Sequence, residues 1–343
     1  MDSPPAALWM HVSPRYPRMR WLFRWGISLG SLTMGLVALF IFRRGLPHVG
    51  WIVGYLLLLW LLFAMLTELR APLEQRGQRL VVSAAHYTIQ SLYHNLLLFV
   101  VPAYYAAATL TSVNAMFLLA VAAGALITAV DPWYERLVRP RPWLEHSLLG
   151  FSIFAALNVA LPLVGVRPFI AVQGSAALAV LALTPAFRHT RAANWQKAYV
   201  FAVSLAVVAA VVAWYARALV PPAPFFLARA VPARAVASLE PVDPARDGSL
   251  SAATVAEWGG ITAYTAIYAP AGIRQAVEHV WFRDGQLLAR IPLPTPIQGG
   301  RREGFRTFSR NQDLKPPLAG RYTVDVKTVS GQLIGRLRFT VTP

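Results

Sequence analysis

Residues 80–130 read LVVSAAHYTIQSLYHNLLLFVVPAYYAAATLTSVNAMFLLAVAAGALITAV, a run of 51 residues without Asp, Glu, Lys or Arg. A transmembrane helix needs about 20 mostly apolar residues, because the hydrocarbon core is about 30 Å thick and a helix rises about 1.5 Å per residue. The run is therefore long enough for two spans. Only 14% of the whole chain is charged, against about 25% in soluble domains, which excludes an ordinary soluble enzyme and a disordered chain.

Five shorter uncharged runs flank this one, and each can hold one span: residues 25–42, 45–67, 146–166, 168–187 and 198–216. Helices are expected because a backbone in lipid must satisfy its polar groups within its own segment, and because the runs are continuously apolar rather than alternating. The fold class is predicted to be a membrane all-α bundle of seven transmembrane helices in residues 1–220. The spans are expected near residues 23–42, 48–67, 87–109, 113–130, 147–164, 168–185 and 197–219.

The basic residues between the spans predict the orientation. Connections on one side contain 13 Lys and Arg residues, and connections on the other side contain three. Cytoplasmic loops carry the excess of basic residues, so the N-terminus is expected in the cytoplasm. No small-residue cleavage site follows the first apolar stretch, which is therefore expected to stay as an uncleaved span. Seven spans then place the C-terminus in the periplasm of a bacterium, and the protein in its inner membrane.

The chain has no cysteine, which excludes disulfides, thiolate metal sites and cysteine nucleophiles. Its 32 Lys and Arg residues outnumber 15 Asp and Glu residues, giving a net charge of +17. We interpret this excess as an orientation signal rather than a nucleic-acid surface. No cofactor or metal is expected.

Residues 253–343 change to the alternating pattern of β-strands. Residues 277–283 and 286–291 alternate around Asp284-Gly285, a strong signal for a hairpin with a type I′ turn. About six short strands predict an all-β immunoglobulin-like sandwich in the periplasm. The prolines of residues 221–252 predict a linker, with Phe225, Phe226 and Leu227 at the membrane surface.

Polar residues gather on one face of the third predicted span. His86, Gln90, Tyr93 and His94 share an arc of about 100° on a helix. Such a stripe in lipid must face the bundle or a wet cavity. It could form a proton or ligand path, with Asn114 as a further candidate, or a helix–helix hydrogen-bond seam. Haem or metal ligation by His86 and His94 is disfavoured, because no histidine on a second helix is evident.

The loop between the fourth and fifth predicted spans combines acids, bases and aromatic residues. Its candidate residues are Asp131, Glu135, Arg139, Arg141 and His146. Carboxylates beside a histidine could perform acid–base chemistry, and arginines could hold a phosphate. The alternative is a cytoplasmic loop that sets orientation and carries interfacial aromatic residues.

Arginines of the C-terminal domain are candidates for binding an anionic partner. The candidates are Arg301, Arg302, Arg306, Arg336 and Arg338, and the alternative is an ordinary solvated sheet face. No phosphate-binding glycine loop, nucleophile elbow or zinc-protease motif occurs in the chain. The sequence therefore contains no strong catalytic signature.

Several short motifs resemble an uncharacterised family of bacterial inner-membrane proteins with a C-terminal periplasmic β domain of unknown function. They are residues 99–105 (FVVPAYY), 111–114 (TSVN), 131–132 (DP), 265–270 (TAIYAP), 278–281 (EHVW), 284–285 (DG), 304–309 (GFRTFS), 320–324 (GRYTV) and 335–339 (GRLRF). Family members often have Trp before the serine of the GFRTFS motif, where this chain has Phe308. The resemblance implies location and architecture, but no activity.

Three hypotheses follow for the function. In the first, a non-enzymatic membrane protein binds an envelope protein, glycan or anionic lipid through its β domain. In the second, a transporter of a small molecule or lipid uses the polar face of the third span. In the third, a membrane enzyme uses the loop at 131–146, which requires Asp131, Glu135 and His146 to converge. The bilayer is an expected partner, and a homo-oligomer is possible.

Overall fold

The computed structural model describes residues 49–190, 194–245 and 247–343, which form two compact units. The first unit contains Leu119–Ala160, Gln173–Ala213 and the described residues up to Pro102. The second unit contains Ala103–Leu118, Leu161–Val172 and Trp214–Pro343. The second unit thus combines the C-terminal β domain with three segments at the ends of helices. The first predicted span, at residues 23–42, lies outside the described residues.

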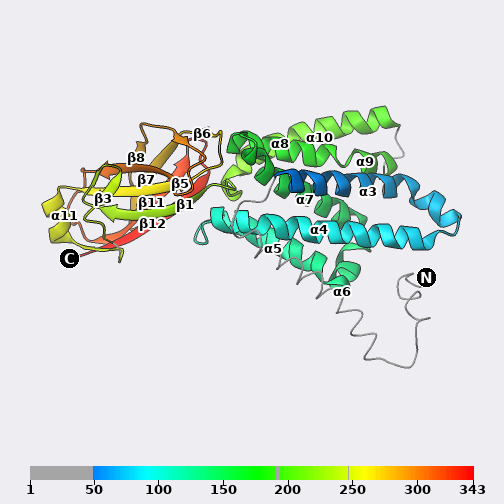
Figure 1. Ribbon diagram of the computed structural model, residues 1–343, viewed down its shortest axis with the longest axis horizontal. Coiled ribbons are helices and arrows are strands. Elements are labelled where there is room, and N and C mark those ends of the chain that lie inside the picture. The colour runs from blue at the N-terminus through cyan, green and yellow to red at the C-terminus, as the bar shows by residue number, and fades with distance from the viewer. Residues whose placement is uncertain (1–48, 191–193, 246) are drawn as a thin grey trace, which may run out of the picture. The chain divides into compact units, whose positions relative to one another are not determined.

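The N-terminal part is helical, as the uncharged runs predict (Figure 1). Its helices are α3 (Val49–Gln75), α4 (Arg79–Ala107), α5 (Ala115–Ala129), α6 (Asp131–Trp133), the π-helix η1 (Tyr134–Val138), α7 (Pro142–Leu163), α8 (Pro168–Leu181), α9 (Thr184–Thr190), α10 (Trp195–Tyr215) and the 3-10 helix η2 (Ala216–Leu219).

Four helical segments in the described part are long and apolar enough to cross a membrane: Ile52–Leu73, Pro142–Leu163, Pro168–His189 and Trp195–Leu219. A fifth is possible if α5 and the segment Asp131–Val138, bent by 97°, form one broken span. Helix α4 coincides with the third predicted span but is not among them, because its polar face lowers its hydropathy. The helical class is confirmed with four or five candidate spans, and the number seven stays a prediction.

The C-terminal domain contains two main sheets and a short helix (Figure 1). The strands are β1 (Phe226–Ala233), β2 (Ala235–Ala237), β3 (Glu240–Val242), β4 (Ser249–Ser251), β5 (Ile261–Tyr268), β6 (Arg274–Gln275), β7 (Val277–Arg283), β8 (Gln286–Pro292), β9 (Ile297–Gln298), β10 (Phe305–Asn311), β11 (Gly320–Thr328) and β12 (Leu333–Thr342). One sheet has the order β1-β5-β10, and the other has the order β4-β12-β11-β7-β8. The β-sheet class is confirmed, and the immunoglobulin-like assignment stays a prediction.

Side chains from both sheets share the core of the domain. Ile261 of β5 packs in one cluster with Trp281 of β7 and Phe339 of β12, and a second cluster contains Phe225, Ile267 and Val326. The β7–β8 hairpin turns at Asp284 and Gly285, which both have positive φ. This is the backbone that a type I′ turn requires, as the sequence predicts.

The predicted linker at 221–252 is wrong, because β1 to β4 form within it. Strand β1 pairs antiparallel with β5 over Phe226–Ala233, and β4 pairs parallel with β12. Pro232 is tolerated because β1 is an edge strand, where a missing N–H costs no ladder bond. Phe225 is buried in the domain core rather than placed at a membrane surface. Helix α11 (Ala252–Trp258), capped by the Ser251 side chain on Thr254 N–H, was also not predicted.

Candidate functional site

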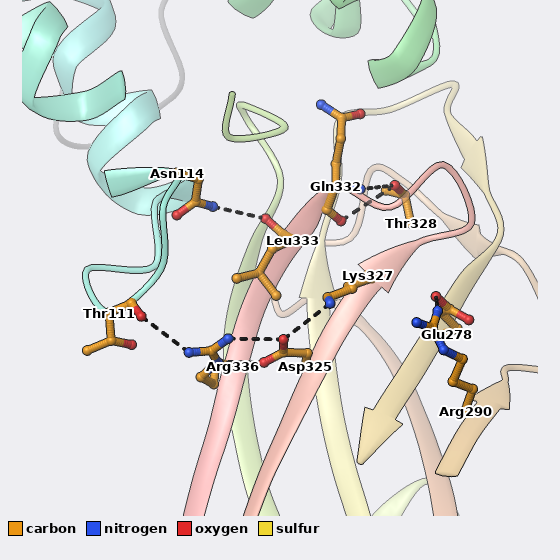
Figure 2. A network of polar contacts seen from close by, with 10 residues as sticks. All are labelled: Thr111, Asn114, Glu278, Arg290, Asp325, Lys327, Thr328, Gln332, Leu333 and Arg336. Atoms are coloured by element: carbon orange, nitrogen blue, oxygen red, sulfur yellow. Dashed lines mark hydrogen bonds and ion pairs between the residues drawn. The ribbon is translucent and has the colours of Figure 1, made fainter. Parts of the chain in front are cut away.

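A polar network joins the loop after α4 to strand β12 within the second unit (Figure 2). Asn114 is fully buried in this loop, and its Oδ1 accepts from the Thr109 N–H at 3.1 Å. Its Nδ2 donates to the Leu333 carbonyl oxygen at 3.4 Å. An amide can accept and donate at once, so Asn114 fixes the shape of its own loop and attaches that loop to β12.

Asp325 on β11 anchors the same network to the sheet. It is buried and faces Arg336 across the β11–β12 ladder. Arg336 donates to both carboxylate oxygens, from Nε at 2.5 Å and from Nη2 at 3.0 Å, and Lys327 Nζ lies 3.4 Å from Oδ2. Paired donors on a carboxylate give a strong and directional contact. Asp325 therefore fixes the Arg336 guanidinium in one orientation.

Thr111, in the loop after α4, accepts hydrogen bonds from two arginines of β12, Arg336 and Arg338. Arg336 Nη1 donates to the Thr111 carbonyl oxygen at 3.3 Å (Figure 2). Arg338 donates to the Thr111 hydroxyl oxygen. The loop is thus bound to β12 by three side chains, with Asn114 as the third.

The turn between β11 and β12 contacts the end of another helical segment. Arg217 of η2 donates from Nε to the Ser330 carbonyl oxygen, and Gln332 Nε2 donates to the Val220 carbonyl oxygen at 3.4 Å. The turn itself is closed by Gln332, whose N–H donates to Thr328 Oγ1 at 3.0 Å. One end of the β11–β12 hairpin therefore contacts two separate helix ends.

The polar face of α4 meets the end of α5 in the first unit. Gln90 donates from Nε2 to the Thr128 carbonyl oxygen at 3.1 Å and to Asp131 Oδ1 at 2.7 Å. His94 Nδ1 lies 3.3 Å from the Ala125 carbonyl oxygen. The last carbonyls of a helix lack partners within that helix. Gln90 contacts such a carbonyl, that of Thr128, beside a 97° bend, whereas the Ala125 carbonyl near His94 also accepts from the Thr128 hydroxyl. This is the geometry of a helix–helix seam.

Further polar residues lie near this seam. His86 Nδ1 is 3.9 Å from Glu145 Oε1 on α7. Tyr93 and Tyr134 are buried, and their hydroxyls have no hydrogen-bond partner within the described part of the chain. The Tyr93 phenol interacts electrostatically with Tyr134 and Glu145. The structure thus brings the two predicted polar sets together, which the sequence did not show.

The candidate loop residues have different partners. Glu135 pairs with Arg139 at 3.2 Å, Asp131 accepts from Gln90, and the His146 ring packs edge-on against Phe63. Arg141 donates to the backbone carbonyls of residues 136 and 137. Asp131, Glu135 and His146 thus make these contacts with three different residues, and their convergence on one acid–base site stays a prediction. In the described ranges, no three His, Cys, Asp or Glu residues are placed to hold a metal ion.

The five candidate arginines fall into two surroundings rather than one basic face. Arg336 and Arg338 bind the loop at 108–114, as described above. Arg306 of β10 pairs with Glu240 at 2.8 Å and Glu303 at 2.9 Å, and Arg301 lies over the Phe305 ring at 5.0 Å. Arg302 is exposed. Arg301, Arg302 and Arg306 thus lie apart from the contact with the loop at 108–114, whereas Arg338 takes part in that contact and is also exposed.

The architecture defines the class of protein: an apolar helical part with helices that could cross a membrane, followed by a C-terminal β-sheet domain. Residues 4–259 match the family described as "Family of unknown function (DUF5924)", which is well over half of the chain. The chain therefore belongs to this family. Residues 274–341 match a second family, "Protein of unknown function (DUF2914)". No curated protein and no solved structure matches.

The seam gives a direct prediction for Gln90. Replacing Gln90 by Met keeps the volume but removes both donors, to the Thr128 carbonyl and to the Asp131 carboxylate. Because a buried acceptor that loses its donor costs about 1–3 kcal/mol, the melting temperature of the purified protein should fall. Thr88→Val is the control, since Thr88 is exposed and its hydroxyl donates within its own helix turn, to the Ala84 carbonyl oxygen. Equal melting temperatures for Gln90→Met and the control would contradict the seam.

Proposed function

We propose that the chain is a non-enzymatic, multi-pass protein of the bacterial inner membrane whose periplasmic β domain binds an envelope partner. The proposal keeps seven spans, a cytoplasmic N-terminus and an immunoglobulin-like arrangement for the β domain. The apolar helices and the distribution of basic residues support the location. The partner is a protein, glycan or lipid that carries negative charge.

The open edge of strand β10 is the observation that carries the proposal. Strand β10 ends its sheet, so among the described residues no strand of that sheet pairs with the other side of its backbone. Its Thr307, Ser309 and Asn311 face the interior, while the Phe308 side chain is 42% exposed. An exposed strand edge is a ready template for an extended chain. Phe308 offers that chain an apolar contact.

The charge beside this edge selects an anionic partner. Arg302 and Arg310 are exposed on either side of Phe308 along the chain, and Arg310 uses one donor on the Trp258 carbonyl. Guanidinium groups pair with carboxylates and phosphates through several donors. Charged residues on an edge strand also prevent strand-to-strand aggregation, so the test must separate partner binding from this protective role.

Photo-crosslinking in living cells distinguishes partner binding from a purely protective role of the arginines. A benzophenone amino acid in place of Phe308 should give a discrete adduct, and the double variant Arg302→Glu, Arg310→Glu should lose it. The same probe in place of Leu287 on β8 is the matched control, and it should give none. No adduct at position 308, or an adduct that survives the charge reversal, would contradict the proposal.

A transporter of a small molecule or lipid is the second candidate, and the buried tyrosine pair favours it. The two buried hydroxyls have no hydrogen-bond partner within the described residues, and Tyr93 interacts electrostatically with Glu145, so a polar molecule bound here would satisfy both hydroxyls. Broken helices line the binding sites of many transporters, and the 97° bend at α5 lies at this place. Native mass spectrometry from mild detergent should then detect a small bound molecule, which the double variant Tyr93→Phe, Tyr134→Phe loses. A wild-type protein without a bound molecule would remove this candidate.

A further inference from the structure

The turn between β11 and β12 exposes an apolar side chain where it contacts the end of a helical span. Val329 in this turn is 67% exposed. We propose that the turn lies in the headgroup layer of the bilayer, with the Val329 side chain inserted toward the hydrocarbon. This inference rests on the membrane-spanning part of the proposed function. It adds the lipid surface as a direct partner of the β domain.

The end of α10 gives the depth of the turn. The candidate span Trp195–Leu219 ends in η2. Tyr215 is 78% exposed near this end, and the Arg217 guanidinium lies 4.3 Å from the centre of the Trp214 ring. Trp and Tyr concentrate where helices leave the hydrocarbon, and arginines reach from there to the headgroups. Residues 214–217 therefore mark one boundary of the membrane core.

Two hydrogen bonds connect the turn to this boundary. Arg217 Nε donates to the Ser330 carbonyl oxygen, and Gln332 Nε2 donates to the Val220 carbonyl oxygen at 3.4 Å. Ser330 is thus separated from the last residues of the span by no more than the length of the Arg217 side chain. Each headgroup layer is about 5–8 Å thick, so a group at this distance cannot be far from it.

The loop between α4 and α5 gives a second, independent contact between a helix end and the same end of the β11–β12 hairpin. Asn114 in the loop between α4 and α5 donates to Leu333, three residues after Ser330. Leu110 in that loop is 68% exposed. The hairpin end therefore contacts two helix ends, η2 and the loop between α4 and α5. The hairpin turn exposes Val329, and the loop between α4 and α5 exposes Leu110.

A lipid headgroup also fits the charge beside the turn. The Val329 N–H donates to the Ala276 carbonyl oxygen at 3.3 Å, which places the turn against the start of β7. Arg274, two residues earlier on β6, is exposed. An exposed arginine next to an apolar tip matches the phosphate and acyl layers of an anionic membrane surface. The bilayer therefore supplies both the apolar and the anionic contact.

Because the chain has no cysteine, single introduced cysteines can carry an environment-sensitive fluorophore in the full-length protein. Val329→Cys tests the turn, and Leu110→Cys tests the helix connection. Leu287→Cys is the matched control, because Leu287 lies just after the Asp284-Gly285 turn at the opposite end of β11. That strand has nine residues, which separates the two ends by about 26 Å at ~3.3 Å per residue. The labelled proteins are placed in nanodiscs of anionic lipid that contains a spin-labelled quencher.

We expect the labels at positions 329 and 110 to emit at shorter wavelength and to lose most of their fluorescence to the quencher. The label at 287 should emit as in water and remain unquenched. A label at 329 that behaves like the label at 287, while position 110 is quenched, overturns the inference alone. Unquenched labels at both 329 and 110 overturn the membrane-spanning part of the proposed function as well. Labelled variants are first compared with wild type by circular dichroism, and Ser330→Cys replaces Val329→Cys if that variant is misfolded.

Discussion

Replacing Gly299 by alanine is expected to prevent the β domain from folding. A Cβ on Gly299 would overlap the carbonyl oxygen of Pro270 and lie 2.5 Å from its carbonyl carbon. Both atoms belong to the backbone, which two hydrogen bonds fix in place: Gly299 N–H to the Ile273 carbonyl and Gly300 N–H to the Ala269 carbonyl, both at 3.0 Å. Neither segment can move without losing these bonds. The expected loss exceeds about 4 kcal/mol, which is comparable to the whole stability of a small domain.

Limited proteolysis of the full-length protein measures this effect. The β-domain fragment of Gly299→Ala should disappear at protease concentrations that leave the wild-type fragment intact. Gly54→Ala in α3 is the control, because within the described chain a Cβ there meets no atom within 4 Å beyond its own helix turn, and alanine favours helix by about 1 kcal/mol over glycine. A Gly299→Ala fragment as resistant as wild type would show that the chain at 269–273 is packed differently.

The second large effect is a loss of β-domain stability in mild acid, caused by His279. This residue of β7 is fully buried and bridges the two sheets. Its Nδ1 lies 2.8 Å from Ser309 Oγ of β10, and its Nε2 lies 3.1 Å from Thr265 Oγ1 of β5. Trp281 Nε1 also donates to Ser309 Oγ, at 3.0 Å. Ser309 can then donate to a neutral His279 Nδ1, an arrangement that a second proton on the ring would break.

Burial lowers the pKa of His279 to about 4, from an ordinary value of about 6.5. The unfolded chain therefore binds a proton more readily than the folded chain between these two values. The stabilisation that depends on a neutral His279 is complete above about pH 6.5. It falls as the pH is lowered, and about 3 kcal/mol is lost by pH 4.

Hydrogen exchange of β7 and β10 in the full-length protein, measured from pH 7 to pH 4, tests this prediction. After correction for intrinsic exchange, protection should decrease with pH in wild type. His279→Gln should start less stable and show a flatter profile, because the titrating group is gone. Identical slopes for the two proteins would assign the acid sensitivity to other groups.

The parts of the fold that the sequence predicts are those with a local signal. A continuous uncharged run predicts a helix wherever it occurs, and the helices α3, α7 and α10 overlap their predicted spans. Asp284-Gly285 between two alternating segments predicts the β7–β8 hairpin, because few other residue pairs adopt the positive φ angles of a type I′ turn. The shared face of Gln90 and His94 also follows from helical spacing alone.

The remaining features depend on partners that are distant in the chain. Asn114 and Leu333 are 219 residues apart, and no spacing rule relates them. The prolines of residues 221–252 favour a linker locally, but pairing with β5 makes residues 226–233 an edge strand, and pairing with β12 makes residues 249–251 another. His279 alternates with Val280 as any strand residue does, so its burial between Thr265 and Ser309 becomes visible only in the assembled sheets.

The central structural claim is that the loop after α4 is bound to strand β12 within the second unit. In the cysteine-free chain, the pair Thr111→Cys, Arg338→Cys should react with a short bifunctional maleimide to give one crosslinked peptide, detected by mass spectrometry. The pair Thr111→Cys, Leu287→Cys should give none, because Leu287 lies on the edge strand β8, which strands β11 and β7 separate from β12. A crosslink in the control pair, or none between positions 111 and 338, would contradict the account.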